Sequence, residues 1–235
     1  MKWDLKLMTD IGNVRETNED GFYISGMRCA GINHCNVDIE LRDHFLCAVV
    51  DGVGGCAHGE VATQLVIDKM DTHAIPSSEE SIVQMLDDLN KTVSEAAERI
   101  ETACTIAGMC VLEDKCFWFN IGDSRVYEIS HGYLNQLSTD DTASGLSGDL
   151  SEGKEPLLQY LGKKGLVPHV GTARNTSSFL LCTDGLSDMV SLDDIEDIIA
   201  SSGRMELGDN LINAAKKAGG NDNVTLLIIR PALEE

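Results

Sequence analysis

The order of strand-like and helix-like segments is the feature that most constrains the fold of this chain. Short stretches rich in β-branched and aromatic residues come in runs, and pairs of amphipathic segments interrupt these runs. A wholly parallel sheet would require strict alternation of strand and helix, so the order predicts an α+β fold with largely antiparallel sheets. The predicted strands are Leu5–Thr9, Phe22–Ser25, Phe45–Val50, Thr105–Leu112, Lys115–Ile121, Arg125–Ser130, Ser178–Cys182 and Val224–Arg230.

The predicted helices carry apolar residues at helical spacing. Ser77 with Glu80 three residues later has the pattern of a capping box at the start of the longest helix. Glu113-Asp114 and His131-Gly132 are predicted hairpin turns. The other helices are Gly59–Met70, one starting at Ser191 with Asp194, and Leu207–Ala218, which ends at Gly219-Gly220.

Charge and length exclude several classes of protein. The chain has 18 basic and 39 acidic residues, a net charge of −21, which disfavours binding to nucleic acid or to an anionic membrane. The start of the chain is charged where a signal peptide needs an apolar run, and no segment is apolar over a membrane-spanning length. No linker-like stretch divides the sequence, so we expect one domain over residues 1–235.

The eight cysteines contain no Cys-x-x-Cys pair and no zinc-like spacing. We therefore expect reduced thiols and a cytoplasmic protein. A metal site in the stretch Gly26–Asp43, which holds Cys29, His34 and Cys35, is a minor alternative to an irregular loop there.

Four acidic segments share an unusual context. Asp51, Asp123, Asp184 and Asp222 each stand where an apolar strand ends or begins, next to Gly or another small turn residue. A carboxylate at a buried strand end is costly unless it is paired or binds a metal. Any one of these segments is adequately explained as a turn. Four together favour a Mg²⁺ or Mn²⁺ site, because the donors are hard oxygen ligands with no histidine beside them.

Taken in order, five segments of the chain resemble the metal-dependent serine/threonine protein phosphatases of the type-2C, or PPM, family, in particular its compact bacterial members. The matching segments are Thr9–Asp20, Val50–Gly55 with Gly59-Glu60, Ile121–Tyr127, Leu181–Asp188 and Gly220–Thr225. The resemblance implies a β-sandwich of two antiparallel sheets flanked by pairs of helices, with a binuclear Mn²⁺ or Mg²⁺ centre at one edge.

The resemblance also implies the metal ligands. Asp51 would bridge the two metals and Gly52 would offer its backbone carbonyl, while Asp184 and Asp222 would bind the second metal. Glu19 and Asp20 would reach the centre largely through water. A weaker third metal would lie at Asp123, Asp184 and Asp188, and Asn223 would shape the loop around Asp222.

The implied reaction is hydrolysis of phosphoserine and phosphothreonine by direct attack of a metal-bridging hydroxide. Asp51, Asp184 and Arg15 would be the catalytic residues, with Arg15 binding the substrate phosphate. The implied partners are phosphorylated proteins, namely a Ser/Thr kinase and its substrates, and we expect a monomer. Two alternatives stay open: a catalytically silent phosphoprotein-binding member of the same fold, and a hydrolase of small phosphoesters.

The chain departs from the family pattern in two places. Val53 stands where some members have a histidine proposed as general acid, so the acid is unassigned, and His58 is a minor candidate for it. The family's Asp-His after a Leu-Thr pair is replaced by Asp140-Asp141. Either aspartate is a further candidate for the group of acidic residues at the metal site. The segment Thr142–Glu155 falls where the family has a mobile flap, and here it is short and polar.

Overall fold

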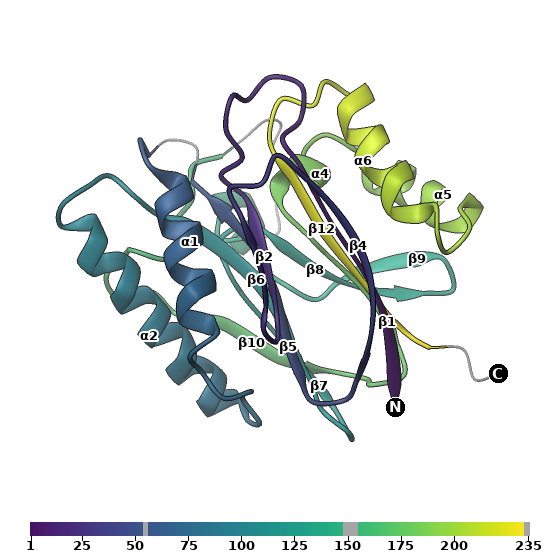
Figure 1. The fold of residues 1–235 in the computed structure, drawn as a ribbon, viewed down its shortest axis with the longest axis horizontal. Helices are drawn as coiled ribbons and strands as arrows, with labels where there is room; N and C mark the ends of the chain where they lie inside the picture. The colour runs from purple at the N-terminus through teal and green to yellow at the C-terminus, as the bar shows by residue number, and fades with distance from the viewer. Residues whose placement is uncertain (54–55, 148–154, 233–235) are drawn as a thin grey trace.

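The computed structural model describes residues 1–53, 56–147 and 155–232. In these residues, two six-stranded sheets pack face to face, and a layer of helices covers the outer face of each sheet (Figure 1). Neighbouring strands pair antiparallel throughout. The predicted α+β sandwich with flanking pairs of helices is confirmed.

The first sheet joins the two ends of the described chain, because its first strand pairs with its last. Its strands, from edge to edge, are β4 (His34–Arg42), β1 (Lys2–Asp10), β12 (Val224–Pro231), β11 (Ser178–Cys182), β8 (Arg125–Ser130) and β9 (Tyr133–Gln136).

The second sheet is built from the middle of the chain. Its strands, in spatial order, are β10 (His169–Ala173), β7 (Cys116–Ile121), β6 (Cys104–Val111), β5 (Phe45–Gly52), β2 (Gly21–Ile24) and β3 (Met27–Ala30). The predicted turn at Glu113-Asp114 joins β6 to β7, and Leu112 N–H donates to the Lys115 carbonyl across it.

Helices α1 (Gly59–Met70) and α2 (Glu79–Ala97) pack on the second sheet, and α5 (Leu192–Ser201) and α6 (Leu207–Lys217) pack on the first (Figure 1). Two short helices, α3 (Ala143–Ser147) and α4 (Asp184–Ser187), lie in connections between strands. No helix of the described residues is long and apolar enough to cross a membrane.

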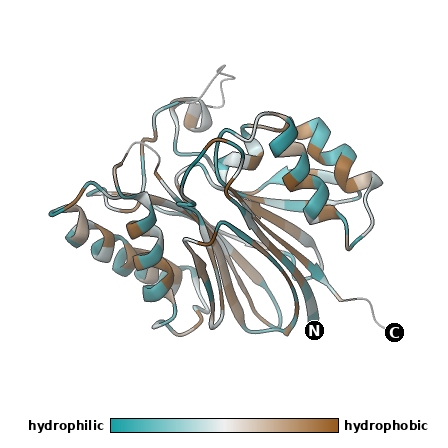
Figure 2. Cartoon of the chain, turned by 45° about the horizontal axis from the view of Figure 1, so that its top comes forward, coloured by the Kyte–Doolittle hydropathy of each residue, from teal (hydrophilic) through white to brown (hydrophobic). Residues whose placement is uncertain are grey.

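Apolar side chains form three layers of core, one between the sheets and one under each helix pair. The strands are correspondingly the most hydrophobic part of the chain, while the helices have one apolar and one polar face (Figure 2). Burial of these faces is the main driving force for the fold. It also leaves the polar ends of the strands as the place where functional groups can gather.

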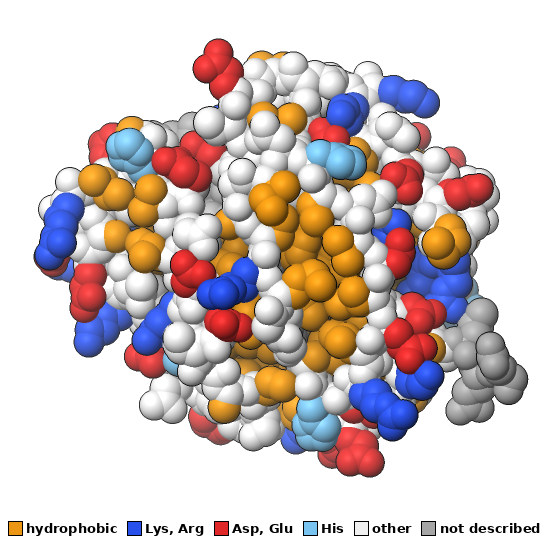
Figure 3. Space-filling model, viewed as in Figure 1, with side chains coloured by type: hydrophobic (Ala, Val, Ile, Leu, Met, Phe, Trp, Pro, Cys, Tyr) orange, Lys and Arg blue, Asp and Glu red, His pale blue; other side chains and the backbone are white. Residues whose placement is uncertain are grey.

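The stretch Gly26–Asp43 is not the irregular loop that we expected from the sequence. It forms β3 and β4, one edge strand of each sheet. Along β4, half-buried Cys35, Val37, Ile39 and Leu41 alternate with exposed polar residues, a pattern of period two that was present in the sequence. Hydrophobic atoms remain visible at the centre of this face of the molecule (Figure 3).

Two more strands, β9 and β10, were absent from the sequence prediction, and one cap was misplaced. The longest helix is capped by Ser78 rather than Ser77, and its partner in the capping box is Ser81 rather than Glu80. The other predicted terminal signals are confirmed: Ser191 accepts a hydrogen bond from Asp194 N–H, and α6 is followed by Gly219 and Gly220 with positive φ.

Candidate metal centre

The predicted site aspartates lie at one end of the sandwich because of how the strands run. β11 is antiparallel to both β8 and β12, so its carboxyl end lies beside their amino ends. Asp184 follows β11, Asp123 precedes β8 and Asp222 precedes β12. Asp51, near the end of β5, brings the second sheet to the same place.

Two adjoining cavities expose these carboxylates. The larger has a volume of about 640 Å³ and is lined by Asp123, Asp184, Asp188 and Asp222 together with Arg15. The smaller, of about 400 Å³, is lined by Asp51, Asp123, Asp184, Asp222 and the same arginine. The structure therefore brings together Asp51, Asp184 and Asp222, proposed for the main metals, with Asp123 and Asp188, proposed for the third, whereas Glu19 and Asp20 do not line these cavities.

Asp51 is half-buried and has four other carboxylates of the cluster as its neighbours. Burial, followed by the charges of Asp20, Asp184, Asp123 and Asp222, raises the pKa of Asp51 well above its ordinary value of 3.8. Like charges packed this closely oppose one another's ionisation. A cation bound among these carboxylates would offset their repulsion and favour their ionised forms. A cluster of this kind is therefore typical of a functional site.

The loop after β1 supplies two further carboxylates. Asp20 is buried, and burial raises its pKa to about 7 although Thr183 Oγ1 donates to its Oδ2 at 2.8 Å. Burial also raises the pKa of Glu19, against the opposing charge of Arg15. Both residues thus lie within the electrostatic influence of the cluster, and their contact with the metals through water stays a prediction.

Gly52 is packed too tightly for a side chain. A Cβ at this position would stand 2.6 Å from the backbone carbon of Gly59 and 2.9 Å from Glu19 Cβ. The start of α1 and the loop bearing Glu19 can therefore approach the end of β5 only if residue 52 is glycine. This is the local reason for the Asp-Gly sequence at this strand end.

Arg15, predicted to bind phosphate, contacts one of the predicted metal ligands. Its Nη2 lies 2.8 Å from Asp222 Oδ2. Asp222 in turn is held in a loop that Asn223 organises: Asn223 accepts a hydrogen bond from Glu19 N–H and donates to the carbonyls of Ile11 and Thr17. The expected role of Asn223 as the residue that shapes this loop agrees with these contacts.

The chemistry of the donors suits Mg²⁺ or Mn²⁺. The ionisable ligand candidates that line the two cavities are carboxylates, without histidine or cysteine. As they are arranged, no three His, Cys, Asp or Glu side chains in the described part of the chain form a ready-made metal-binding group. The carboxylates share a cavity, therefore, but their side chains do not already stand at ligand positions.

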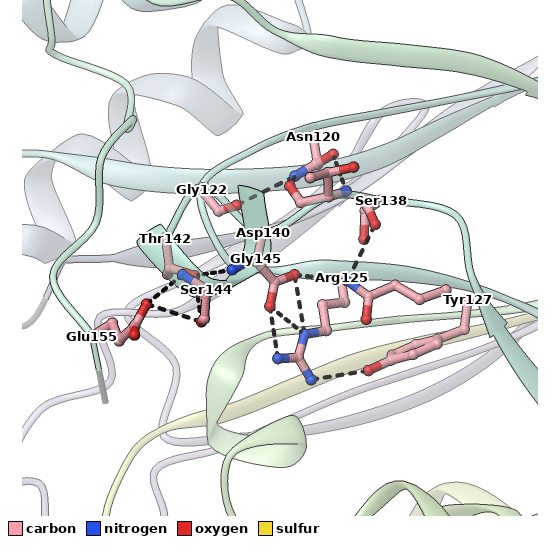
Figure 4. Close-up of polar contacts among 12 residues, drawn as sticks. Asn120, Gly122, Arg125, Tyr127, Ser138, Asp140, Thr142, Ser144, Gly145 and Glu155 are labelled. Atoms are coloured by element: carbon pink, nitrogen blue, oxygen red, sulfur yellow. Dashed lines mark hydrogen bonds and ion pairs between the residues drawn. The ribbon is translucent and has the colours of Figure 1, made fainter. Parts of the chain in front are cut away.

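Asp140 and Asp141 have structural roles that the sequence did not reveal. Asp140 accepts hydrogen bonds from Arg125 Nε and Nη2 at 2.9 and 2.7 Å, and Arg125 also reaches the Tyr127 hydroxyl (Figure 4). Asp141 is fully buried and accepts from Gly122 N–H, Gln159 Nε2 and His169 Nε2, at 2.8, 2.6 and 2.9 Å. These contacts, rather than a metal, account for both carboxylates.

The minor candidates do not join the site. His58 is exposed at the start of α1, with Nδ1 3.5 Å from Glu60. His34 lies opposite Asp10 in the pairing of β4 with β1, with Nδ1 3.4 Å from Asp10 Oδ2, and no metal-binding group involving Cys29 or Cys35 is found in the described residues. Val53 lines the smaller cavity and has no proton to donate.

Sequence reasoning missed several residues of the cavity wall. Glu155 lines both cavities and accepts hydrogen bonds from the backbone and hydroxyl of Ser144 (Figure 4). Leu157 and Tyr160 line the smaller cavity. No catalytic or metal-binding role was assigned to them, because Glu155 is the last residue of the predicted flap and Leu157 and Tyr160 follow it. Residues 148–154 of that flap, like Gly54 and Gly55, lie outside the described residues.

Comparisons with known proteins relate this chain to phosphatases. The family model described as Protein phosphatase 2C matches residues 36–223. The serine/threonine phosphatase Stp of Listeria welshimeri is 27% identical over 94% of this chain and 93% of its own length. The serine/threonine protein phosphatase PstP of Mycobacterium tuberculosis is 31% identical over 94% of this chain, which spans 43% of that relative.

A solved structure extends the likeness to three dimensions. The catalytic domain of PstP, determined in complex with two manganese ions, superposes with a TM-score of 0.77 at 27% identity and covers 97% of this chain and 98% of that one.

Proposed function

The chain belongs to the protein phosphatase 2C family, and from that premise we propose that it is a metal-dependent protein phosphatase acting on phosphoserine and phosphothreonine. The observation that carries the proposal is the convergence of Asp51, Asp123, Asp184 and Asp222 on cavities that Arg15 also lines. The named activities of Stp and PstP and the two manganese ions of the PstP catalytic domain support it.

The proposed metal ligands are those predicted from the sequence. Asp51, the Gly52 carbonyl, Asp184, Asp222, Glu19 and Asp20 would hold two divalent ions, Mn²⁺ or Mg²⁺, and Asp123 with Asp188 would hold a weaker third. When bound, such ions activate a water for attack on phosphorus and neutralise charge on the phosphoryl oxygens.

The protein's own contribution is to position the phosphate and the ligands. Arg15 lies in both cavities, where its planar guanidinium can donate to two phosphate oxygens. Its present partner, Asp222, is a proposed ligand, so substrate and metal would each draw one member of this ion pair away from the other. The Thr183 hydroxyl fixes Asp20, and Asn223 joins the loop that carries Glu19 to the loop that carries Asp222.

The test is hydrolysis of p-nitrophenyl phosphate and of a phosphothreonine peptide, with Mn²⁺, with Mg²⁺ and with EDTA. We expect turnover of both substrates with Mn²⁺, none with EDTA, and loss of activity in Asp184→Asn. Asp193→Asn, an exposed carboxylate on α5, is the matched control and should retain activity. Absence of turnover with either metal between pH 6 and 9 would contradict the proposal.

The same assay separates the alternatives. A silent phosphoprotein-binding member would bind the peptide without hydrolysing it, and a small-ester hydrolase would turn over only p-nitrophenyl phosphate. The presence of Asp51, Asp184 and Asp222 favours an active enzyme over a silent member.

Four finer expectations belong to the proposal. The substrates would include a Ser/Thr kinase and its targets, the chain would be a monomer, residues 1–235 would form one domain, and the location would be cytoplasmic. Pairing of β1 with β12 supports the single domain. Light scattering, limited proteolysis and cell fractionation test the last three, and phosphoproteomics on cells that carry Asp184→Ala tests the first.

A further inference from the structure

Two cavities extend from the carboxylate cluster, and their walls differ in chemistry. Arg15, Asp184 and Asp222 line both, so a phosphate bound at Arg15 would lie where the two meet. The larger cavity continues among polar side chains: Arg125, Asp140, Thr142, Ser144, Ser187 and Asp188. The smaller is lined by Thr105 and Glu155 and continues to Val53, Pro156, Leu157 and Tyr160; these last four we call the apolar arm.

The apolar arm is built on anchored backbone. Leu158 N–H donates to the Asp141 carbonyl at 2.7 Å, and the Gln159 side chain donates to the buried Asp141 carboxylate at 2.6 Å. Val53, another residue of the arm, is held by its backbone N–H, which donates to the Ala103 carbonyl at 3.0 Å. A preformed wall of this kind binds an apolar group without a large cost of ordering.

The arm still has apolar surface to bury. Val53, Leu157 and Tyr160 are each only half-buried, and Pro156 is exposed. Covering them with a hydrocarbon side chain would remove apolar surface from water, which is favourable. An acidic side chain there would instead lose hydration and meet the carboxylates of Glu155 and of the cluster.

The position of the arm identifies its occupant. A phosphorylated residue whose phosphate lies at Arg15 must send its polypeptide chain outward on two sides, and consecutive residues of an extended peptide are about 3.3 Å apart. The residue next to the phosphorylated one therefore falls within reach of the cavity that borders the cluster.

We propose that the apolar arm is a specificity pocket for an aliphatic or aromatic residue directly beside the phosphoserine or phosphothreonine of the substrate. This inference rests on the proposed phosphatase function. In this chain Val53 would then be part of the substrate-binding wall.

The test compares phosphothreonine peptides that differ only in whether Leu or Ser flanks the phosphorylated residue, with each flank varied separately. For the unsubstituted enzyme with Mn²⁺, we expect kcat/KM to favour Leu by about tenfold or more at one flank. Equal kcat/KM for Leu and Ser at both flanks would overturn the inference while leaving the phosphatase function standing.

A pair of adjacent leucines provides the variant and its control. Leu157→Ser should lower kcat/KM for the Leu-flanked peptide and abolish the preference. Leu158→Ser should keep the preference, because Leu158 is 40% exposed and does not line the cavity. If Leu157→Ser keeps the preference, or if both variants lose it, the pocket is not the apolar arm.

Turnover of p-nitrophenyl phosphate distinguishes failure of this inference from failure of the function. Hydrolysis of p-nitrophenyl phosphate without hydrolysis of any phosphopeptide would overturn both the protein phosphatase and the pocket. No hydrolysis of any substrate would overturn the function itself, and the inference with it.

Discussion

Two carboxylates near the same cavity, Asp51 and Asp141, illustrate how burial can serve opposite purposes. Asp141 is fully buried and accepts hydrogen bonds from a backbone N–H, an amide and an imidazole. Asp51 has four carboxylates among its neighbours, and burial together with their charge raises its pKa. A buried carboxylate supplied with donors holds the fold together, whereas one surrounded by carboxylates is a cost that a cation-dependent activity explains.

Removal of Asp51 gives the sharpest test of this contrast. Asp51→Asn should lower Mn²⁺-dependent hydrolysis of p-nitrophenyl phosphate by about 1,000-fold or more, because charge stabilisation in the transition state is lost. The same change should leave the free energy of unfolding in EDTA unchanged or raise it, since one of several repelling charges disappears. Loss of stability in the chelated protein would show that Asp51 is a structural carboxylate after all.

Removal of the Asp141 carboxylate, unlike removal of the Asp51 carboxylate, should destabilise the protein. Asp141→Asn places an amide donor against existing donors, and we expect the free energy of unfolding to fall by about 2–3 kcal/mol. Urea denaturation measures it, with exposed Asp114→Asn as the control for loss of one negative charge. Equal stability of the two variants would mean that the hydrogen bonds of Asp141 contribute nothing net.

The free energy of unfolding, measured in EDTA as a function of pH, should report the ionisation of Asp20. The pKa of Asp20 is raised from 3.8 to about 7, chiefly by burial, so the folded state binds this proton more tightly than the unfolded state does. The free energy of unfolding should therefore fall as pH rises from about 4 to 7, by about 4 kcal/mol, because a change of one pKa unit is worth about 1.4 kcal/mol, and level off above that. Urea titrations in EDTA should show a flatter profile for Asp20→Asn, and a profile identical to that of the unsubstituted protein would refute the assignment.

Asp10 should have the smallest effect on the free energy of unfolding, and its pH dependence should be opposite to that of Asp20. Burial opposes its ionisation, but hydrogen bonds from Lys216 Nζ and Gly12 N–H outweigh burial and lower its pKa. Its stabilising contribution is present above the unfolded pKa near 4 and is lost as pH falls through the lower folded pKa. Asp10→Asn should cost about 1 kcal/mol at pH 6 and less at pH 3, measured by urea denaturation; a difference that grows on acidification would contradict this.

The sequence was informative where a local pattern and the fold agree. The apolar runs that end in Asp-Gly predicted both the central strands and the carboxylates of the cavity, because a buried strand needs hydrophobic residues and its end needs a turn. Edge strands gave weaker signals: β9 and β10 are short and partly exposed, and Gly171 in β10 has no side chain because its Cβ would stand 2.5 Å from the Trp118 ring.

By itself, the sequence determined the antiparallel α+β order and the helix termini at Ser191 and Gly219, and it predicted a set of acidic residues for the site. Only the tertiary structure decided which acids face one another and which are supplied with donors. Asp140 and Asp141 are adjacent in the chain, yet one pairs with Arg125 and the other with His169, from different sheets. Local propensity acts over a few residues, whereas the electrostatic environment of a carboxylate depends on groups that only the packing of the two sheets brings together.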